Sequence, residues 1–228
     1  MDCMTSDTSP ETSAGTDDAF TRFDFAALSP KERYKLLIGT VVPRPIAWVT
    51  TVDPEGRVNA APFSFFNVLS ADPAILAIGV ENHDDLSQKD TARNIRLTGE
   101  FTVNIVDFAN LETMNTTAVA FPTGEDEVAA AGLTVLPGTH VKSPFIAEAP
   151  AALECRRHIT LEIGPSRAIV LGEVVALHIR SSLVNERLHV DPVGLDALGR
   201  MGGHGYCRSG ETFDLATPSL AAWRAGRT

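Results

Sequence analysis

Two long β-rich runs follow one another at residues 152–163 and 168–180, separated by a short segment that contains Gly164-Pro165. Strands joined by so short a turn run antiparallel, because a parallel pair needs a crossover of a dozen or more residues. Gly172 stands inside the second run, which predicts a bulge or the close approach of another group. The pair therefore favours an antiparallel sheet over alternating strands and helices.

A second hairpin is predicted earlier in the chain. Residues 46–52 (IAWVTTV) are β-branched and read as a strand, and residues 57–63 return as its partner. The turn between them, Asp53-Pro54-Glu55-Gly56, combines a Pro that fixes φ with a Gly that permits positive φ. Two further apolar strands are expected at 74–80 and 101–106. The sequence thus predicts one mostly β domain over residues 21–228, with small helices between strands, and a barrel architecture.

The expected helices are short. Ser29 caps a helix that has Pro30 at its first position and Glu32 for a capping box, and Pro43-Arg44-Pro45 ends it. Ser87 and Asp90 fit a second capping box, with Gly99 as the stop. Two more short helices are predicted at 110–118 and 125–131.

Composition excludes some classes of partner. The formal net charge of −10 argues against nucleic acid and anionic membranes, which require clustered Lys and Arg. Three scattered cysteines without a CxxC pair favour a reducing, cytoplasmic location. No signal peptide and no membrane span is recognisable, and residues 1–20 are predicted to be a disordered acidic tail.

Metal and nucleophile sites are not predicted. The six histidines form no HExxH or other paired motif, and the chain has no GxSxG. Three weaker candidates remain, each with a plain structural alternative. Lys89 and Thr91, in the first turn of a helix, suit a phosphate or else a solvated turn. Ser64, Phe65, Phe66 and Asn67 suit a flavin edge or else core packing. The glycine-rich segment 199–206 lines a pocket or else is a flexible loop.

The order of these pieces is more specific than any one of them. The motifs are NAAPFSFFN at 59–67, KDTARN at 89–94 and RMGGHGY at 200–206, within an arrangement that covers roughly residues 30–215. Together they resemble the flavin reductase-like family of FMN-binding split β-barrel proteins, which includes flavoredoxin. One departure is Asp72-Pro73-Ala74, where the family often has Pro-Pro after the Asp.

The resemblance implies a homodimer with FMN near the dimer interface. The flavin phosphate would contact Arg44, Thr50, Lys89 and Thr91, and the ring would lie along Ser64, Phe65, Phe66 and Asn67 with Trp48 nearby. The late motif would approach the exposed side of the ring and the substrate through Gly202, Gly203, His204 and Tyr206. A surface loop histidine is the alternative for His204.

The resemblance also implies an NAD(P)H-linked flavin reductase, in which hydride passes from nicotinamide to flavin N5. No acid–base residue is required for that step, so no catalytic residue is assigned. An FMN-bearing electron carrier, a flavin-binding module without turnover and a relative of pyridoxamine-phosphate oxidases remain alternatives. The choice between NADH and NADPH and the identity of a monooxygenase or electron-transfer protein partner stay open.

Overall fold

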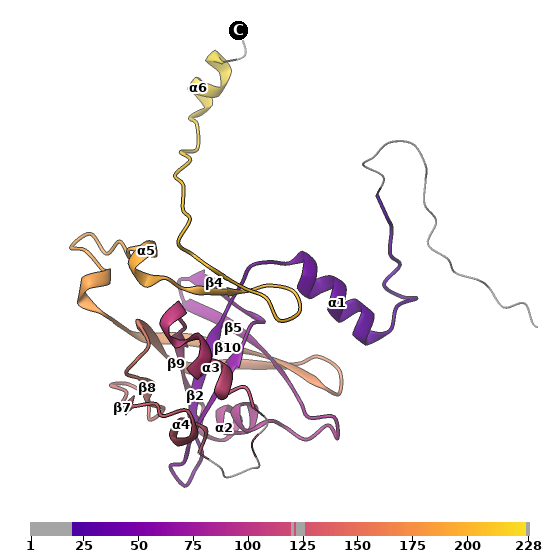
Figure 1. The fold of residues 1–228 in the computed structure, drawn as a ribbon, viewed down its shortest axis with the longest axis vertical. Helices are drawn as coiled ribbons and strands as arrows, with labels where there is room; N and C mark the ends of the chain where they lie inside the picture. The colour runs from indigo at the N-terminus through magenta and orange to yellow at the C-terminus, as the bar shows by residue number, and fades with distance from the viewer. Residues whose placement is uncertain (1–19, 120, 122–125, 227–228) are drawn as a thin grey trace, which may run out of the picture.

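The structure is a computed structural model that describes residues 20–119, 121 and 126–226. The acidic tail predicted at residues 1–20 lies outside the described residues apart from Phe20. β-strands are the main regular secondary structure of the described chain, with short helices between them (Figure 1), as the sequence predicts. None of the helices in these residues is long and apolar enough to cross a membrane.

A seven-stranded antiparallel sheet forms the body. In spatial order its strands are β3 (Val58–Phe63), β2 (Ala47–Val52), β6 (Glu100–Ile105), β9 (Ala151–Glu162), β10 (Arg167–Ile179), β5 (Ala74–Glu81) and β4 (Phe66–Ala71). Smaller sheets are formed by β1 (Arg44–Pro45), β11 (Leu198–Arg200) and β12 (Tyr206–Arg208), and by β7 (Val135–Leu136) and β8 (Phe145–Ile146). The helices are α1 (Pro30–Thr40), α2 (Asp90–Thr98), α3 (Leu111–Thr116), α4 (Glu127–Ala130), α5 (Pro192–Leu195) and α6 (Leu220–Ala225), with 3-10 turns at Phe108–Asn110 and Ser181–Leu183.

The two edge strands of this sheet are neighbours in the sequence. β3 ends at Phe63 and β4 begins at Phe66, so only Ser64 and Phe65 separate the two edges. Two residues span only about 7 Å when extended, so the sheet must curl until its edges meet at this corner. Phe63 and Phe66 pack against the core, whereas Phe65 is 39% exposed. The corner thus explains why the alternation of apolar and polar residues breaks at Phe65-Phe66.

The core lies on both faces of β2. Ala47 and Val49 pack inside the curled sheet with Leu76, Ile78 and Phe101, and α2 covers one end of this cluster through Ala92 and Ile95. On the opposite face, Trp48 packs in a second cluster with Ile46, Val106, Met114 and Ile146. β2 is consequently buried along its whole length. This burial on both faces determines whether two predicted site residues on β2, Trp48 and Thr50, can reach a ligand.

Most of the predicted elements are confirmed. The hairpin around Asp53–Gly56, the strands at 74–80 and 101–106 and the long pair β9–β10 are all present. Ser29 forms the predicted capping box with Glu32. The register between β10 and β9 shifts at Leu171/Gly172, and a Cβ on Gly172 would collide with the Phe101 ring, so both expectations for this glycine hold.

The prediction of a capping box at Ser87 and Asp90 is wrong. α2 begins at Asp90 with Lys89 as its N-cap residue and without a side-chain cap. The Ser87 hydroxyl instead donates a hydrogen bond to Asp85 Oδ1 at 2.6 Å. This hydrogen bond takes the place of the predicted helix cap. The helices predicted at 110–118 and 125–131 are present but shorter, as α3 and α4, and β4 was not foreseen.

Candidate functional site

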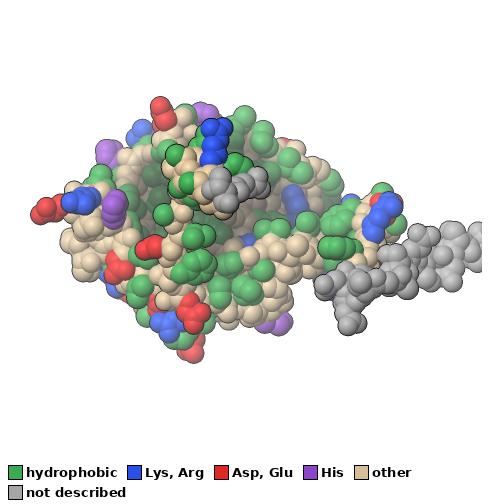
Figure 2. All heavy atoms as spheres, turned by 90° about the horizontal axis from the view of Figure 1, so that it is seen from above, with side chains coloured by type: hydrophobic (Ala, Val, Ile, Leu, Met, Phe, Trp, Pro, Cys, Tyr) green, Lys and Arg blue, Asp and Glu red, His purple; other side chains and the backbone are tan. Residues whose placement is uncertain are grey.

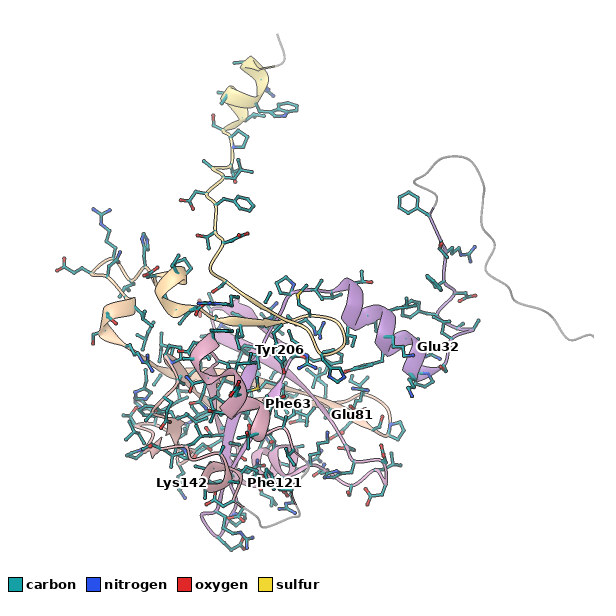
Figure 3. The ribbon with its side chains drawn as sticks, in the orientation of Figure 1. Glu32, Phe63, Glu81, Phe121, Lys142 and Tyr206 are labelled. Carbon is teal, nitrogen blue, oxygen red and sulfur yellow. The ribbon has the colours of Figure 1, made fainter. Side chains whose placement is uncertain are left out.

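Two cavities meet along β3. The first, called here the α2 cavity, has a volume of about 450 Å³. The second, the Tyr206 cavity, has a volume of about 270 Å³. Both are lined by Pro62, Phe63 and Ala118, so together they form one continuous cleft. In Figure 3, Tyr206, which lines the Tyr206 cavity, lies above Phe63, and Phe121, which lines the α2 cavity, lies below it.

The α2 cavity brings together the two residues predicted for an anion. Lys89 is the N-cap of α2, and Thr91 lies in the first turn with only 2% of its surface exposed. The Thr91 hydroxyl is 3.4 Å from Asn59 Oδ1. The N–H groups of an uncapped helix start carry partial positive charge, which adds to the ammonium of Lys89.

Carboxylates also line the α2 cavity. Two of them are already paired with arginines, Asp90 with Arg93 and Glu81 with Arg167, each at 2.7 Å. Burial raises the pKa of Glu127, which favours its neutral form. The negative potential at Lys89 is therefore weaker than the number of acidic residues suggests.

The Tyr206 cavity lies under the β1–β11–β12 sheet. Ser64, Gly203 and Tyr206 line it together with Phe63 from β3. Arg200 of β11 lies over the Tyr206 ring, 4.4 Å from its centroid, and donates to the Tyr206 hydroxyl and to the Gly203 carbonyl at 2.7 Å. The glycine-rich segment therefore forms a hairpin that lines a cavity.

Arg44 reaches the same cavity from β1 and is 7% exposed. Its guanidinium donates to the carbonyls of Ile38 (2.6 Å), Val41 (3.0 Å) and Met201 (3.2 Å), and its Nε has no partner in the described residues. Burial lowers the pKa of Arg44. Arg44 does not line the α2 cavity that contains Lys89, so the structure separates two residues that were expected to share one phosphate.

An apolar groove lies on the other side of the β3–β4 corner. The Phe65 groove has a volume of about 470 Å³ and is lined by residues of α1, β1, β4 and β5, among them Leu37, Val41, Ser64, Phe65, Phe66 and Asn67. Phe65 packs against Tyr34 with ring centroids 6.2 Å apart. Residues 64–67, which were predicted to lie together along the flavin ring, all line the Phe65 groove, but only Ser64 among them also lines the Tyr206 cavity.

Trp48 and Thr50 differ from the expectation. Both side chains are 0% exposed. The Trp48 indole donates to Thr117 Oγ1 at 2.9 Å, and the Thr50 hydroxyl donates to the Pro144 carbonyl at 2.5 Å. Neither side chain is available to a ligand in this arrangement. The physical reason is that β2 is covered on both faces, so no face of it remains for a cofactor.

His204 lies exposed at the tip of the β11–β12 hairpin and does not line either cavity, in line with the surface alternative. Sequence reasoning assigned no role to Arg200, although the motif RMGGHGY begins with it. Its position in the site depends on the pairing of β11 with β1, which no local pattern reveals.

The cleft suits a flat, amphipathic cofactor with an anionic end. Phe63 and Pro62 supply apolar contact, Ser64 supplies a hydroxyl, and Lys89 lies toward one end. These residues fit a flavin mononucleotide. Among the described residues, no group of three or more His, Cys, Asp or Glu side chains could hold a metal ion.

Solved structures resemble this chain closely. Nitrilotriacetate monooxygenase component B from Bacillus cereus is 33% identical, with a TM-score of 0.83 over 87% of this chain and 100% of that one. The 2-nitrobenzoate 2-nitroreductase NbaA of Pseudomonas fluorescens is 35% identical, with a TM-score of 0.81 over 88% of this chain and 98% of that one.

A protein with a split barrel domain from Shewanella frigidimarina NCIMB 400 shares the fold, at 21% identity and a TM-score of 0.75 over 85% of this chain and 96% of that one. The fold is thus the split barrel expected from the sequence. The flavin reductase like domain family matches residues 38–194. The chain therefore belongs to the flavin reductase-like family.

Proposed function

We propose that this protein is an FMN-dependent oxidoreductase that uses NADH or NADPH to reduce its flavin. The observation that carries the proposal is the continuous cleft along β3, which has a lysine at a helix start toward one end and an aromatic hairpin at the other. Such a cleft provides apolar walls for a ring system and positive charge for a phosphate.

In this proposal the phosphate of FMN binds at Lys89 and the first turn of α2, near Thr91. The ring lies along Phe63 and Ser64, and Gly203 and Tyr206 stand at its other face. The β3–β4 corner is stabilised by Phe65, Phe66 and Asn67 from the side of the Phe65 groove. Trp48 and Thr50 act at a distance, by fixing β2 beneath the cleft.

Bound flavin would supply the hydride chemistry, and the protein would supply position and shielding. Tyr206, with Arg200 over its ring, and Phe63 line the Tyr206 cavity and would shield the ring of the flavin. Within the residues that line the Tyr206 cavity no His, Asp or Glu occurs, so the described cavity offers no carboxylate or imidazole for general acid–base catalysis.

The named relatives support oxidoreductase activity. One is a component of a monooxygenase and another is a nitroreductase. We therefore extend the proposal to a partner protein or a small organic compound as the final electron acceptor. A reducing cytoplasm is consistent with the free thiols of Cys155 and Cys207.

We also propose a homodimer formed through the Phe65 groove. Leu37 (48%), Val41 (59%) and Val68 (61%) are large apolar side chains exposed at or beside it. Seen from above, hydrophobic side chains predominate and charged ones gather mainly toward the outline (Figure 2). A second copy of the chain would cover this surface and place its own residues beside Ser64, which borders both groove and cleft.

The test is anaerobic reduction of the FMN-loaded protein, followed by absorption near the flavin maximum. Bleaching by NADH or NADPH is the expected result and identifies the preferred coenzyme. A protein that binds FMN but bleaches only with a reduced protein donor is an electron carrier, which contradicts the reductase proposal. Bound flavin that neither donor reduces would identify a binding module without turnover.

A further inference from the structure

Two arginines face each other across a strand pair beside the cleft. Arg44 of β1 and Arg200 of β11 are direct partners in the antiparallel register. Like charges at directly opposite positions repel and destabilise a sheet. Burial lowers the pKa of Arg44, and repulsion from Arg200 lowers it further. A pair that opposes folding in this way needs a compensating partner.

No carboxylate among the described residues pairs with either arginine. Arg44 donates only to backbone carbonyls, and Arg200 donates to the Tyr206 hydroxyl and a carbonyl. Five other arginines each contact a carboxylate instead: Arg57, Arg93, Arg96, Arg167 and Arg208. None of the described residues that line the Tyr206 cavity is acidic, although the whole chain carries a formal charge of −10. The cavity is thus a locally cationic site in an acidic protein.

Arg44 also contributes to this site a buried hydrogen-bond donor without a partner among the described residues. Arg44 is 7% exposed, and its Nε has no hydrogen-bond partner in the described chain. Buried polar groups are normally satisfied, so the guanidinium of Arg44, which lines the cavity, keeps one hydrogen-bond donor unused. The hydrogen bonds of Arg200 to Tyr206 and Gly203 use two of the five N–H groups that a guanidinium carries, and the remaining ones can bind an oxyanion side-on.

We propose that Arg44 and Arg200 bind the anionic group of the second ligand, the compound that meets the flavin in the Tyr206 cavity. This inference rests on the proposed function, and it names the substrate class as small aromatic or heterocyclic anions. The anionic group is a carboxylate on an organic acceptor or a phosphate on the nicotinamide nucleotide. The phosphate of the flavin itself binds elsewhere, at Lys89 in the α2 cavity.

The experiment compares pairs of probes in which only one member carries an anionic group. Benzoate and benzamide are titrated onto the FMN-loaded protein and followed by the change in flavin absorption. Nicotinamide mononucleotide and nicotinamide riboside form the second pair. In the wild type we expect the member of at least one pair that carries the carboxylate or phosphate to bind about tenfold or more tightly than the member that lacks it. The pair that shows the preference identifies the source of the anion.

The variants are Arg200→Gln and a matched control, Arg208→Gln. Arg208 also lies over an aromatic ring, Phe108 at 4.3 Å, but it pairs with Asp196 and lines neither cavity. Arg200→Gln should abolish the preference for the probe that carries the anionic group, and Arg208→Gln should retain it. Arg44→Lys is a second variant, which keeps the charge but lacks the planar fork and should reduce the preference. Unfolding midpoints of all variants verify that they fold.

Three results would overturn the proposal. The first is equal affinity for both members of both pairs in the wild type. The second is a preference that survives in Arg200→Gln. The third is a loss of affinity for FMN but not for riboflavin in Arg200→Gln, since the arginines would then hold the flavin phosphate. If the wild type binds no flavin, the proposed function fails, and calorimetry with benzoate and benzamide on the flavin-free protein still decides whether the arginine pair prefers an anion.

Discussion

Lys89 and Arg44 line different cavities of one cleft, with Phe63 and Pro62 between them on β3. Each is a cation without a carboxylate partner among the described residues, although the sequence suggested that both serve one phosphate. Their separation gives each of the two cavities a cationic side chain, with an apolar stretch between them. A flavin nucleotide needs only one such cation, so the second is free for another ligand.

The assignment of the flavin phosphate to Lys89 predicts a selective loss. Replacing Lys89 with Gln should weaken FMN binding about tenfold, because a charge-assisted hydrogen bond to the phosphate disappears. Riboflavin, which has no phosphate, should bind as before. Fluorescence titration of both flavins measures the effect. The control is Arg96→Gln on the same helix, which pairs with Glu162 outside the cleft; equal losses for FMN and riboflavin in Lys89→Gln would refute the assignment.

The Phe65 groove predicts a dimer. Phe65→Ala should lower the dimer affinity, because it removes a large apolar side chain from the proposed contact. FMN retention should fall with it, since Ser64 next to Phe65 borders the cleft. Light scattering at several concentrations and the flavin content after gel filtration give the two readouts. Leu97→Ala, which alters a 61% exposed side chain on α2, should change neither. A wild-type chain that stays monomeric at all concentrations would contradict the dimer.

Glu154 predicts an acid-dependent loss of stability. Burial alone would raise the pKa of this carboxyl, but hydrogen bonds from His178, Thr139 and the His140 N–H outweigh it and lower the pKa to about 2. A depressed pKa stabilises the fold above the unfolded value of 4.5, and this contribution fades as the pH falls from there toward 2. Its size at neutral pH is roughly 3 kcal/mol.

Glu154→Gln should therefore destabilise the protein at pH 7, and the difference from the wild type should shrink as the pH falls below about 4.5. Urea unfolding at a series of pH values measures it. Glu173→Gln on the exposed side of β10 is the control. If the difference in the free energy of unfolding between the wild type and Glu154→Gln stays constant between pH 7 and pH 3, the charge of Glu154 is not what stabilises the loop at residues 137–143, which contains Thr139 and His140.

Gly172 predicts a packing defect. Gly172→Ala should lower the free energy of unfolding by about 1–3 kcal/mol, because its Cβ would collide with the Phe101 ring in the core. The midpoint of urea unfolding should fall. Gly210→Ala, with no atom within 4 Å of the added Cβ, should be close to neutral. An unchanged midpoint for Gly172→Ala would mean that Phe101 moves aside without cost.

The strands of this fold could be predicted because their signals are local. β-branched runs and the turns at Asp53–Gly56 and Gly164-Pro165 lie within a few residues of one another. β4 escaped prediction because Phe66–Ala71 is a mixed, exposed edge strand without clear alternation. The Ser87 cap failed because Asp85 competes for the same hydroxyl, which a motif alone does not reveal.

The site was predicted less completely because it depends on long-range pairing. Trp48 and Thr50 share a strand face, but only the tertiary structure reveals that Thr117 and Pro144 already satisfy them. Arg44 meets Arg200 through a register between segments far apart in the sequence. Lys89, Thr91 and Ser64, which family motifs mark directly, line the two cavities, and their contacts with a flavin stay a prediction.

The central claim is that flavin occupies the cleft along β3, and blocking the junction of its two cavities tests this most directly. Ala118 lines both cavities and is exposed, so Ala118→Trp adds bulk there without entering the core. FMN titration should give a Kd about tenfold or more above the wild-type value, while Glu112→Trp on the exposed surface of α3 leaves the Kd unchanged. Wild-type affinity in a folded Ala118→Trp variant would place the flavin elsewhere and contradict the account.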